Sequence, residues 1–420
     1  MISIYLDNAA KTQVKKEVLD VITKSLNEDW YNPSSSYQPG VEVKEKIEQV
    51  RKLIADKINA KPNEIFFTSG GCEGNSWVIK NFENILYDPL SHTSVIKEIN
   101  KKKKECGKWI CNGRFRDFDI RNLKCNEFGE IDISNISNYL EELYVGYYYD
   151  ENFNDKYIIT VCGANNEIGT IQLIRVIRDV IETYNQKSRQ EYCRNYNMNL
   201  NEVKDWHKQF IFHVDGTQML PYMKIDVQDM GVDMMTFSGA KIGCPSGIGF
   251  VYIKENRQKS IDSLISGEQE KGLRGGTQNV PYILGLGKAM QLLDTDTSHL
   301  ESLRNYFVNK LLTLPDTKLV GSSLSRLPNN VNICFGNIDA TALLSYLNLN
   351  GIYASSGSAC NSNSLEPSHV LKEIGLSDIE ANSCVRFTLS NETTVEELEE
   401  VFSVIERFVT RQNKYLGKGE

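Results

Sequence analysis

The chain has 420 residues and a mass of 47.7 kDa, which is long enough for two domains with a sizeable core. Its composition, 40% hydrophobic and 24% charged, is that of an ordinary globular protein and excludes a disordered or fibrous chain. With 47 Lys and Arg against 55 Asp and Glu, the net charge is −8, so a surface that binds nucleic-acid phosphates is not expected.

Over the first two-thirds of the chain, short apolar runs alternate with amphipathic stretches, a pattern typical of a parallel sheet covered by helices. The amphipathic spacing predicts helices over residues 17–26 and 41–58. Apolar runs that stop at small or polar residues predict buried strands over residues 64–69, 157–162, 210–215 and 232–238. The expected fold class is therefore α/β.

From about residue 263 the pattern changes to a glycine-rich stretch at 272–279, followed by a helix over 282–293. Strands are then expected at 329–335 and 383–390, with a last helix over 395–409. We expect a large domain over residues 14–262 and a smaller α+β domain over 263–420, on which residues 1–13 pack. Two polar stretches, 101–117 and 184–208, are interpreted as insertions of unknown role.

The ten cysteines are scattered along the chain with no CxxC pair, which favours a reduced, cytoplasmic protein. Cys106, Cys111 and Cys125 lack the spacing and the nearby histidine of a zinc site, so no metal is expected. Cys334 and Cys384 lie in apolar strand candidates and are expected to be small core residues. No apolar run approaches the roughly 18 residues of a membrane helix, and no secretory signal is visible.

In open α/β sheets, ligands bind beyond the carboxyl ends of the strands, where four polar loops are expected here. They hold the Gly70–Glu73 turn into a helix, the polar run 163–169, Asp215 with Gln218, and Ser238 with Lys241. Taken singly these are ordinary features: a tight turn, turn-forming asparagines, a helix cap and a surface lysine. Together they offer an anion site, a carboxylate, amides and one lysine, which are the groups that hold pyridoxal phosphate.

At this point the chain resembles a known family, the group I cysteine desulfurases of the NifS/IscS type, within the class V aminotransferase superfamily of pyridoxal-phosphate enzymes of fold type I. The resemblance runs nearly end to end. Its motifs are LDNAAKT (6–12), YNPSSSYQPG (31–40), FFTSGGCEGN (66–75), NNEIGTIQ (165–172), HVDGTQ (213–218), VDMMTFSGAKIGCPSGIGF (232–250), LRGGTQNV (273–280), SSGSACNSNSLEPSHVL (355–371) and VRFTLSNETTVEELE (385–399). It implies a mainly parallel sheet in a large domain beside a smaller α+β domain.

The resemblance also implies roles for individual residues. Lys241 would form the Schiff base with the cofactor, Asp215 would pair with the pyridine nitrogen, and His92 would lie on the ring face. The remaining assignments are Gln218 and Asn166 at the ring oxygen and substrate; Ser238, Gly71 and Cys72 at the phosphate; and Arg386 with Asn32 at the substrate carboxylate. Thr277 would contact the phosphate in a second subunit, which implies a homodimer.

The implied reaction converts L-cysteine to L-alanine and leaves the sulfur as a persulfide on Cys360, which lies in a Ser- and Gly-rich segment. The sulfur would then pass to an acceptor protein in iron–sulfur assembly or in tRNA or nucleic-acid sulfur modification, and the sequence does not distinguish these routes. No direct contact with nucleic acid and no membrane association are expected.

Two positions depart from the family pattern at the phosphate site. Ala240 stands where relatives commonly have histidine, and Cys72 stands where they have threonine, so we expect looser cofactor binding or a compensating donor. Two alternatives stay open. One is another class V enzyme, such as a selenocysteine lyase or a small aminotransferase, and the other is a degenerate member kept as a regulatory subunit.

Overall fold

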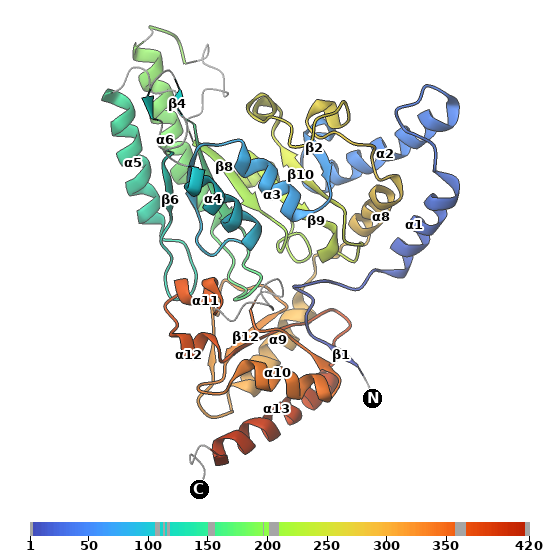
Figure 1. The fold of residues 1–420 in the computed structure, drawn as a ribbon, viewed down its shortest axis with the longest axis vertical. Helices are drawn as coiled ribbons and strands as arrows, with labels where there is room; N and C mark the ends of the chain where they lie inside the picture. Colours follow the sequence, from blue (N-terminus) through green and yellow to red (C-terminus); the bar gives the residue numbers. More distant parts are fainter. Residues whose placement is uncertain are drawn as a thin grey trace.

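The structure, a computed structural model, describes residues 3–105, 110–111, 114–115, 118–149, 156–195, 197–200, 210–357 and 367–415. It has a large body built on a seven-stranded sheet and a smaller body that holds most of the last third of the chain (Figure 1). Within the described ranges, no helix combines the length and the apolar character needed to cross a bilayer.

The central sheet is mainly parallel, as the sequence predicts. Its strand order is β2 (Ile65–Thr68), β10 (Gly249–Ile253), β9 (Met234–Ser238), β8 (Phe210–Asp215), β7 (Tyr157–Cys162), β3 (Asn84–Tyr87) and β6 (Ile120–Asn122). Only β10 runs antiparallel to its neighbours, β2 and β9, and every other pair is parallel. The carboxyl ends of the other six strands therefore meet at one edge of the sheet.

Helices cover both faces of this sheet (Figure 1), which explains why its strands are apolar at successive positions. Phe66 packs on one face with α3 (Gly71–Lys80) and α4 (Thr93–Glu105), whereas Phe67 packs on the other. That second face carries α1 (Lys16–Glu28), α2 (Gln38–Lys57), α5 (Ile133–Tyr149), α6 (Ile174–Asn195), α7 (Val227–Met230) and α8 (Val280–Gln291). The predicted insertion at 101–117 begins in α4 and includes the short pair β4 (Ile110–Cys111) and β5 (Arg114–Phe115); the one at 184–208 begins inside α6.

The packing of α8 bears on the domain division. Two glycines let α8 approach the first two helices: a Cβ on Gly285 would lie 2.7 Å from Ile22, and one on Gly287 would lie 2.7 Å from Val50. Residues 280–291 thus share the core of the large sheet with α1 and α2. The domain division between residues 262 and 263 stays a prediction. The helix α8, which follows this division in the chain, packs with the large body.

The smaller body has an antiparallel sheet in the order β11 (Lys318–Leu319), β12 (Asn330–Cys334) and β14 (Cys384–Thr388). Its helices are α9 (Ser298–Leu311), α10 (Ala340–Leu349), α11 (His369–Glu373), α12 (Asp378–Ala381) and α13 (Val395–Tyr415). Cys334 and Cys384 are buried opposite each other on β12 and β14, which confirms them as core residues.

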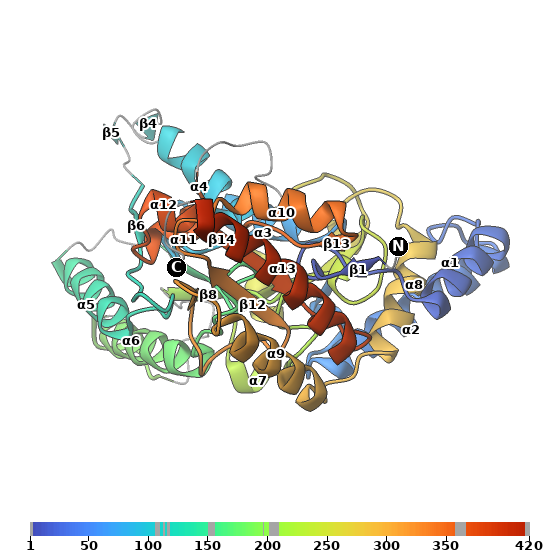
Figure 2. The ribbon, with the colours of Figure 1, turned by 90° about the horizontal axis from the view of Figure 1, so that it is seen from below.

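The start of the chain belongs to the smaller body. β1 (Ile4–Tyr5) pairs in parallel with β13 (Ile352–Tyr353), and Figure 2 shows the two strands side by side from below. Ile4 and Leu6 are buried in the core of that body. Asn8 and Ala9 still hydrogen-bond to Thr388 on β14, and from the Ala9 carbonyl onward the chain contacts the large body, where α1 begins.

Candidate active site

Nine of the predicted site residues line a single cavity of about 210 Å³ at the carboxyl edge of the central sheet. They are Gly71, Cys72, His92, Asn166, Asp215, Gln218, Ser238, Lys241 and Arg386. Thr217, Asn75, Ala9 and Ala10 also line this cavity. Most of these residues lie at or just after the carboxyl ends of strands, as the sequence predicted for a parallel sheet.

Asp215 is the last residue of β8 and is only 5% exposed. Its Oδ2 accepts a hydrogen bond from Asn75 Nδ2 at 2.7 Å, and its Oδ1 accepts one from the backbone N–H of Thr217 at 3.0 Å. Both oxygens are thereby held in place while the side chain still borders the cavity. Such a fixed carboxylate suits a cationic ring nitrogen as its partner.

Lys241 ends the short 3₁₀ helix Gly239–Lys241 that follows β9. Its Nζ donates to the carbonyl oxygen of Ala10, and Gln218 Nε2 donates to the carbonyl oxygen of Ala9 at 3.0 Å. The N-terminal segment therefore forms one wall of the cavity through its backbone.

His92 immediately precedes α4 and borders the cavity. Its Nδ1 accepts from the backbone N–H of Ser94 at 3.2 Å and lies 2.8 Å from the Ser94 hydroxyl. Burial, the largest influence, lowers the pKa of His92 below its usual 6.5, and the negative charge of Asp215 partly opposes this. The neutral ring is therefore favoured near pH 7.

The first turn of α3 offers an anion site. The backbone N–H groups at a helix N-terminus lack partners within the helix and attract negative charge. Here two hydroxyls border the same turn, since a Cβ on Gly71 would lie 3.1 Å from Thr217 Oγ1 and one on Gly70 would lie 3.7 Å from Ser238 Oγ. Thr217 Oγ1 is buried, and among the described residues it has no hydrogen-bond partner.

This arrangement fits pyridoxal phosphate. A phosphate at the first turn of α3 would give the Thr217 hydroxyl the partner that it lacks. Thr217 would then be a candidate for the compensating donor expected from the substitution of a hydroxyl by the thiol of Cys72, and this assignment stays a prediction. The sequence pointed to its loop but not to Thr217 itself, because an isolated threonine in a turn carries no distinctive signal.

Arg386 approaches the cavity from the smaller body, on β14, and is 1% exposed. Its Nη2 pairs with Asp7 Oδ1 at 2.6 Å, and its Nη1 donates to the carbonyl oxygen of Asn166 at 3.0 Å. Its Nε is buried and has no partner in the part of the chain that the structure describes. A guanidinium with a remaining N–H at a cavity is suited to binding a carboxylate.

The structure does not bring every predicted residue to this cavity. Asn32 and Thr277 lie outside its lining, and Cys360 falls outside the described residues. Asn32 uses its side-chain oxygen locally, accepting from the Ser34 N–H at 2.9 Å. Thr277 is exposed on the segment that precedes α8.

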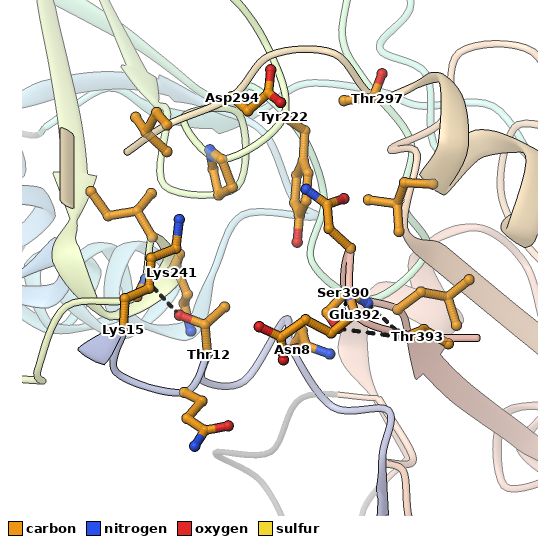
Figure 3. A pocket seen from close by; sticks show the side chains of 18 of the residues that line it. Asn8, Thr12, Lys15, Tyr222, Lys241, Asp294, Thr297, Ser390, Glu392 and Thr393 are labelled. Atoms are coloured by element: carbon orange, nitrogen blue, oxygen red, sulfur yellow. Dashed lines mark hydrogen bonds between the residues drawn. The ribbon is translucent and has the colours of Figure 1, made fainter. Parts of the chain in front are cut away.

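A second cavity, of about 410 Å³, is lined in part by the N-terminal segment (Figure 3). Lys241 lines both cavities, and Asn8, Thr12 and Tyr222 line the second. Thr12 ties the segment to the lysine loop, because its hydroxyl donates to Ala240 O at 3.1 Å and accepts from Gly243 N at 2.9 Å. In the described residues, no cluster of three or more His, Cys, Asp or Glu side chains is placed to hold a metal ion.

Comparison with known proteins agrees with this geometry. The aminotransferase class-V family, a family of pyridoxal-phosphate enzymes, matches residues 4–187 and 198–401. A curated relative, the cysteine desulfurase IscS of Methanosarcina thermophila, is 33% identical over 97% of this chain and 92% of its own length. Among solved structures, a NifS-like protein superposes with a TM-score of 0.80 at 26% identity, covering 97% of this chain and all of that one (100%). A structure titled SspA in complex with cysteine superposes with a TM-score of 0.71 at 27% identity, over 92% and 99% of the two chains. The chain therefore belongs to the class-V aminotransferase family, in the branch whose curated members are cysteine desulfurases.

Proposed function

We propose that this protein is a pyridoxal-phosphate-dependent cysteine desulfurase, which converts L-cysteine to L-alanine and keeps the sulfur as a persulfide on Cys360. The observation that carries the proposal is the meeting of Asp215, Lys241 and Arg386 at one cavity of about 210 Å³. Support comes from the relatives named cysteine desulfurase and from the related protein solved with cysteine.

Each of these three residues has a task that its surroundings suit. Asp215 would hold the protonated ring nitrogen, Lys241 would carry the cofactor and move the Cα proton, and Arg386 would bind the substrate carboxylate. Pyridoxal phosphate, when bound, supplies an electron-withdrawing ring that makes the Cα proton of the substrate acidic and the Cβ–S bond breakable. His92, whose lowered pKa favours the neutral ring near pH 7, borders the cavity and would exchange a proton there.

The sulfur transfer balances without another reactant. L-cysteine and the Cys360 thiol give L-alanine and the Cys360 persulfide, so the substrate sulfur becomes the outer sulfur and no electrons are gained or lost overall. The persulfide is then available to an acceptor in iron–sulfur assembly or in RNA or DNA sulfur modification. A cytoplasmic location stays a prediction, which rests on the scattered, unpaired pattern of the cysteines in the sequence.

We also propose a homodimer in which Thr277 contacts the cofactor phosphate of the second subunit. Thr277 is exposed and lies outside the cavity of its own chain. Its segment is held firmly: Gln278 Nε2 donates to Glu270 Oε1 at 3.1 Å, and Arg274 pairs with Glu73 Oε1 at 2.8 Å. An exposed hydroxyl on a segment anchored by these contacts suits a contact with a second copy. Light scattering should give a dimer mass, and a monomer at micromolar concentration would contradict this part.

The test of the activity is alanine formation from L-cysteine by the purified protein with added pyridoxal phosphate. We expect activity in the wild type and in Lys15→Ala, because Lys15 lines only the second cavity, and none in Lys241→Ala. Faster turnover of L-selenocysteine than of L-cysteine would instead favour a selenocysteine lyase. Absence of any bound-cofactor absorbance would favour a regulatory subunit.

A further inference from the structure

Two residues with no assigned role, Asn75 and Ser94, connect Asp215 to His92. Asn75, on α3, is 1% exposed and donates from Nδ2 to Asp215 Oδ2 at 2.7 Å. The same Nδ2 donates to Ser94 Oγ at 3.1 Å, and Ser94 Oγ lies 2.8 Å from His92 Nδ1. Carboxylate and imidazole are thus joined through one amide and one hydroxyl.

The direction of each hydrogen bond in this chain follows from chemistry. The ionised Asp215 can only accept, so Asn75 must present its NH₂ group to it. The backbone N–H of Ser94 can only donate, so His92 Nδ1, which it contacts at 3.2 Å, carries no proton. The Ser94 hydroxyl then accepts from Asn75 and donates its own proton to Nδ1. In the neutral ring, the proton must be on Nε2.

We propose that Ser94, oriented by Asn75, is a positioning residue that fixes His92 as the Nε2–H tautomer, so that Nε2 is the atom that exchanges a proton at the cavity. Only the use of this proton in catalysis rests on the proposed function. The tautomer itself is a property of the protein, and cofactor and substrate are not needed to observe it.

The groups around His92 set its titration. Asp215 on β8 favours the protonated ring, whereas Lys241 after β9, His369 on α11 and Lys97 on α4 disfavour it, and burial outweighs each of them. Two donors at Nδ1 also favour the neutral ring. A proton on Nδ1 would face the backbone N–H and the hydroxyl hydrogen of Ser94. Removing the Ser94 hydroxyl takes one of these donors away and should make His92 easier to protonate.

The test is nitrogen NMR of protein labelled with ¹⁵N-histidine, without added cofactor. The chain has five histidines, so the His92 signals can be assigned by their loss in His92→Gln. In the wild type we expect the Nε2–H pattern and an apparent pKa below 6.5. Ser94→Ala should raise that pKa by about half a unit to one unit and admit the Nδ1–H tautomer, whereas Ser94→Thr, which keeps the hydroxyl, should behave as wild type.

Two results would overturn the inference: an Nδ1–H pattern in the wild type, or unchanged tautomer and pKa in Ser94→Ala. A folding defect is detected separately, because the other histidine signals would shift as well. If the NMR results are as expected and the protein forms no alanine, the proposed function fails while the positioning of His92 stands. In an active enzyme, the acid limb of the kcat profile should move in Ser94→Ala in the same direction as the NMR pKa.

Discussion

Arg386 and Asp7 form an ion pair of 2.6 Å at the active-site cavity, although 379 positions separate them in the chain. Asp7 follows β1, and Arg386 lies on β14 of the smaller body. The pair holds the guanidinium beside the Asn166 carbonyl while its Nε is still unpartnered among the described residues. The two ends of the chain together therefore build the proposed carboxylate-binding side of the cavity.

Arg386→Lys should raise the KM for L-cysteine by roughly tenfold or more, because an ammonium cannot replace a planar guanidinium that contacts Asp7, Asn166 and a substrate carboxylate together. Cofactor absorbance should be retained. Arg121→Lys is a control, since Arg121 pairs with Asp119 at 2.6 Å and does not line the cavity. An unchanged KM in Arg386→Lys would remove Arg386 from the substrate site.

Thr217→Val should weaken pyridoxal phosphate binding by about tenfold or more, since hydrogen bonds to charged groups contribute about 1.5–3 kcal/mol. Cys72→Thr should strengthen binding, because a hydroxyl is a better donor than a thiol at the first turn of α3. Titration of the apoprotein, followed by the absorbance of the bound cofactor, measures both changes. Equal affinity in Thr217→Val and wild type would exclude Thr217 from the phosphate site.

The ion pair of Arg51 with Glu270 should be important for stability. Its side chains are 9% and 1% exposed, with Nη1–Oε2 at 2.7 Å, and Glu270 also accepts from Phe67 N at 3.1 Å. Glu270→Ala removes the buried partner of Arg51, which keeps only the half-exposed Glu48 and the Ile65 carbonyl, and should lower the free energy of unfolding by about 3 kcal/mol.

The matched control is Glu255→Ala, which breaks a nearby pair with Lys61 whose side chains are 53% and 67% exposed. An exposed pair is screened by water and contributes little to stability, so chemical denaturation should separate the two variants clearly. Similar losses in both variants would contradict the predicted importance of the buried pair for stability.

His213 should make stability depend on pH. It is fully buried between Thr160 Oγ1 at 2.8 Å and Thr236 Oγ1 at 3.0 Å. Burial lowers its pKa from 6.5 to about 4, against the opposing charge of Asp215. As the pH falls through this interval, the unfolded chain binds a proton that the folded chain does not, so stability falls by up to about 1.4 kcal/mol per pH unit.

His213→Gln lacks this titration but keeps a polar side chain between the two threonines. The stability advantage of the wild type over the variant should be greatest above pH 6.5 and should shrink as the pH approaches 4. Unfolding curves at matched pH values measure the difference, and an advantage that stays constant would show that His213 is not held neutral.

The local parts of this architecture could be predicted from the sequence. β2, β8 and β9 are apolar runs that end at a glycine turn, at Asp215 and at Ser238, so both the strand and its functional end are visible in a few residues. The helices α1, α2 and α13 follow from apolar spacing in the same way. These features depend only on neighbours in the chain.

Features that depend on distant partners were not predicted. The antiparallel insertion of β10 between β2 and β9 is decided by pairing across the sheet, and the packing of α8 on α1 is decided by contacts with Ile22 and Val50. The Asn75–Ser94 connection joins two helices, and neither residue type is distinctive by itself. Sequence reasoning therefore found the residues at the strand ends but not those that position them.

The central claim is tested most directly by alanine and protein-persulfide formation in one turnover of L-cysteine, comparing wild type, Cys360→Ser and Cys125→Ser. Cys125 is a suitable control because burial raises its pKa to about 11 and it lies outside the cavity. We predict one persulfide per active site in the wild type and in Cys125→Ser, and neither persulfide nor alanine in Cys360→Ser despite normal cofactor absorbance. Persulfide and alanine at wild-type levels in Cys360→Ser would contradict the account.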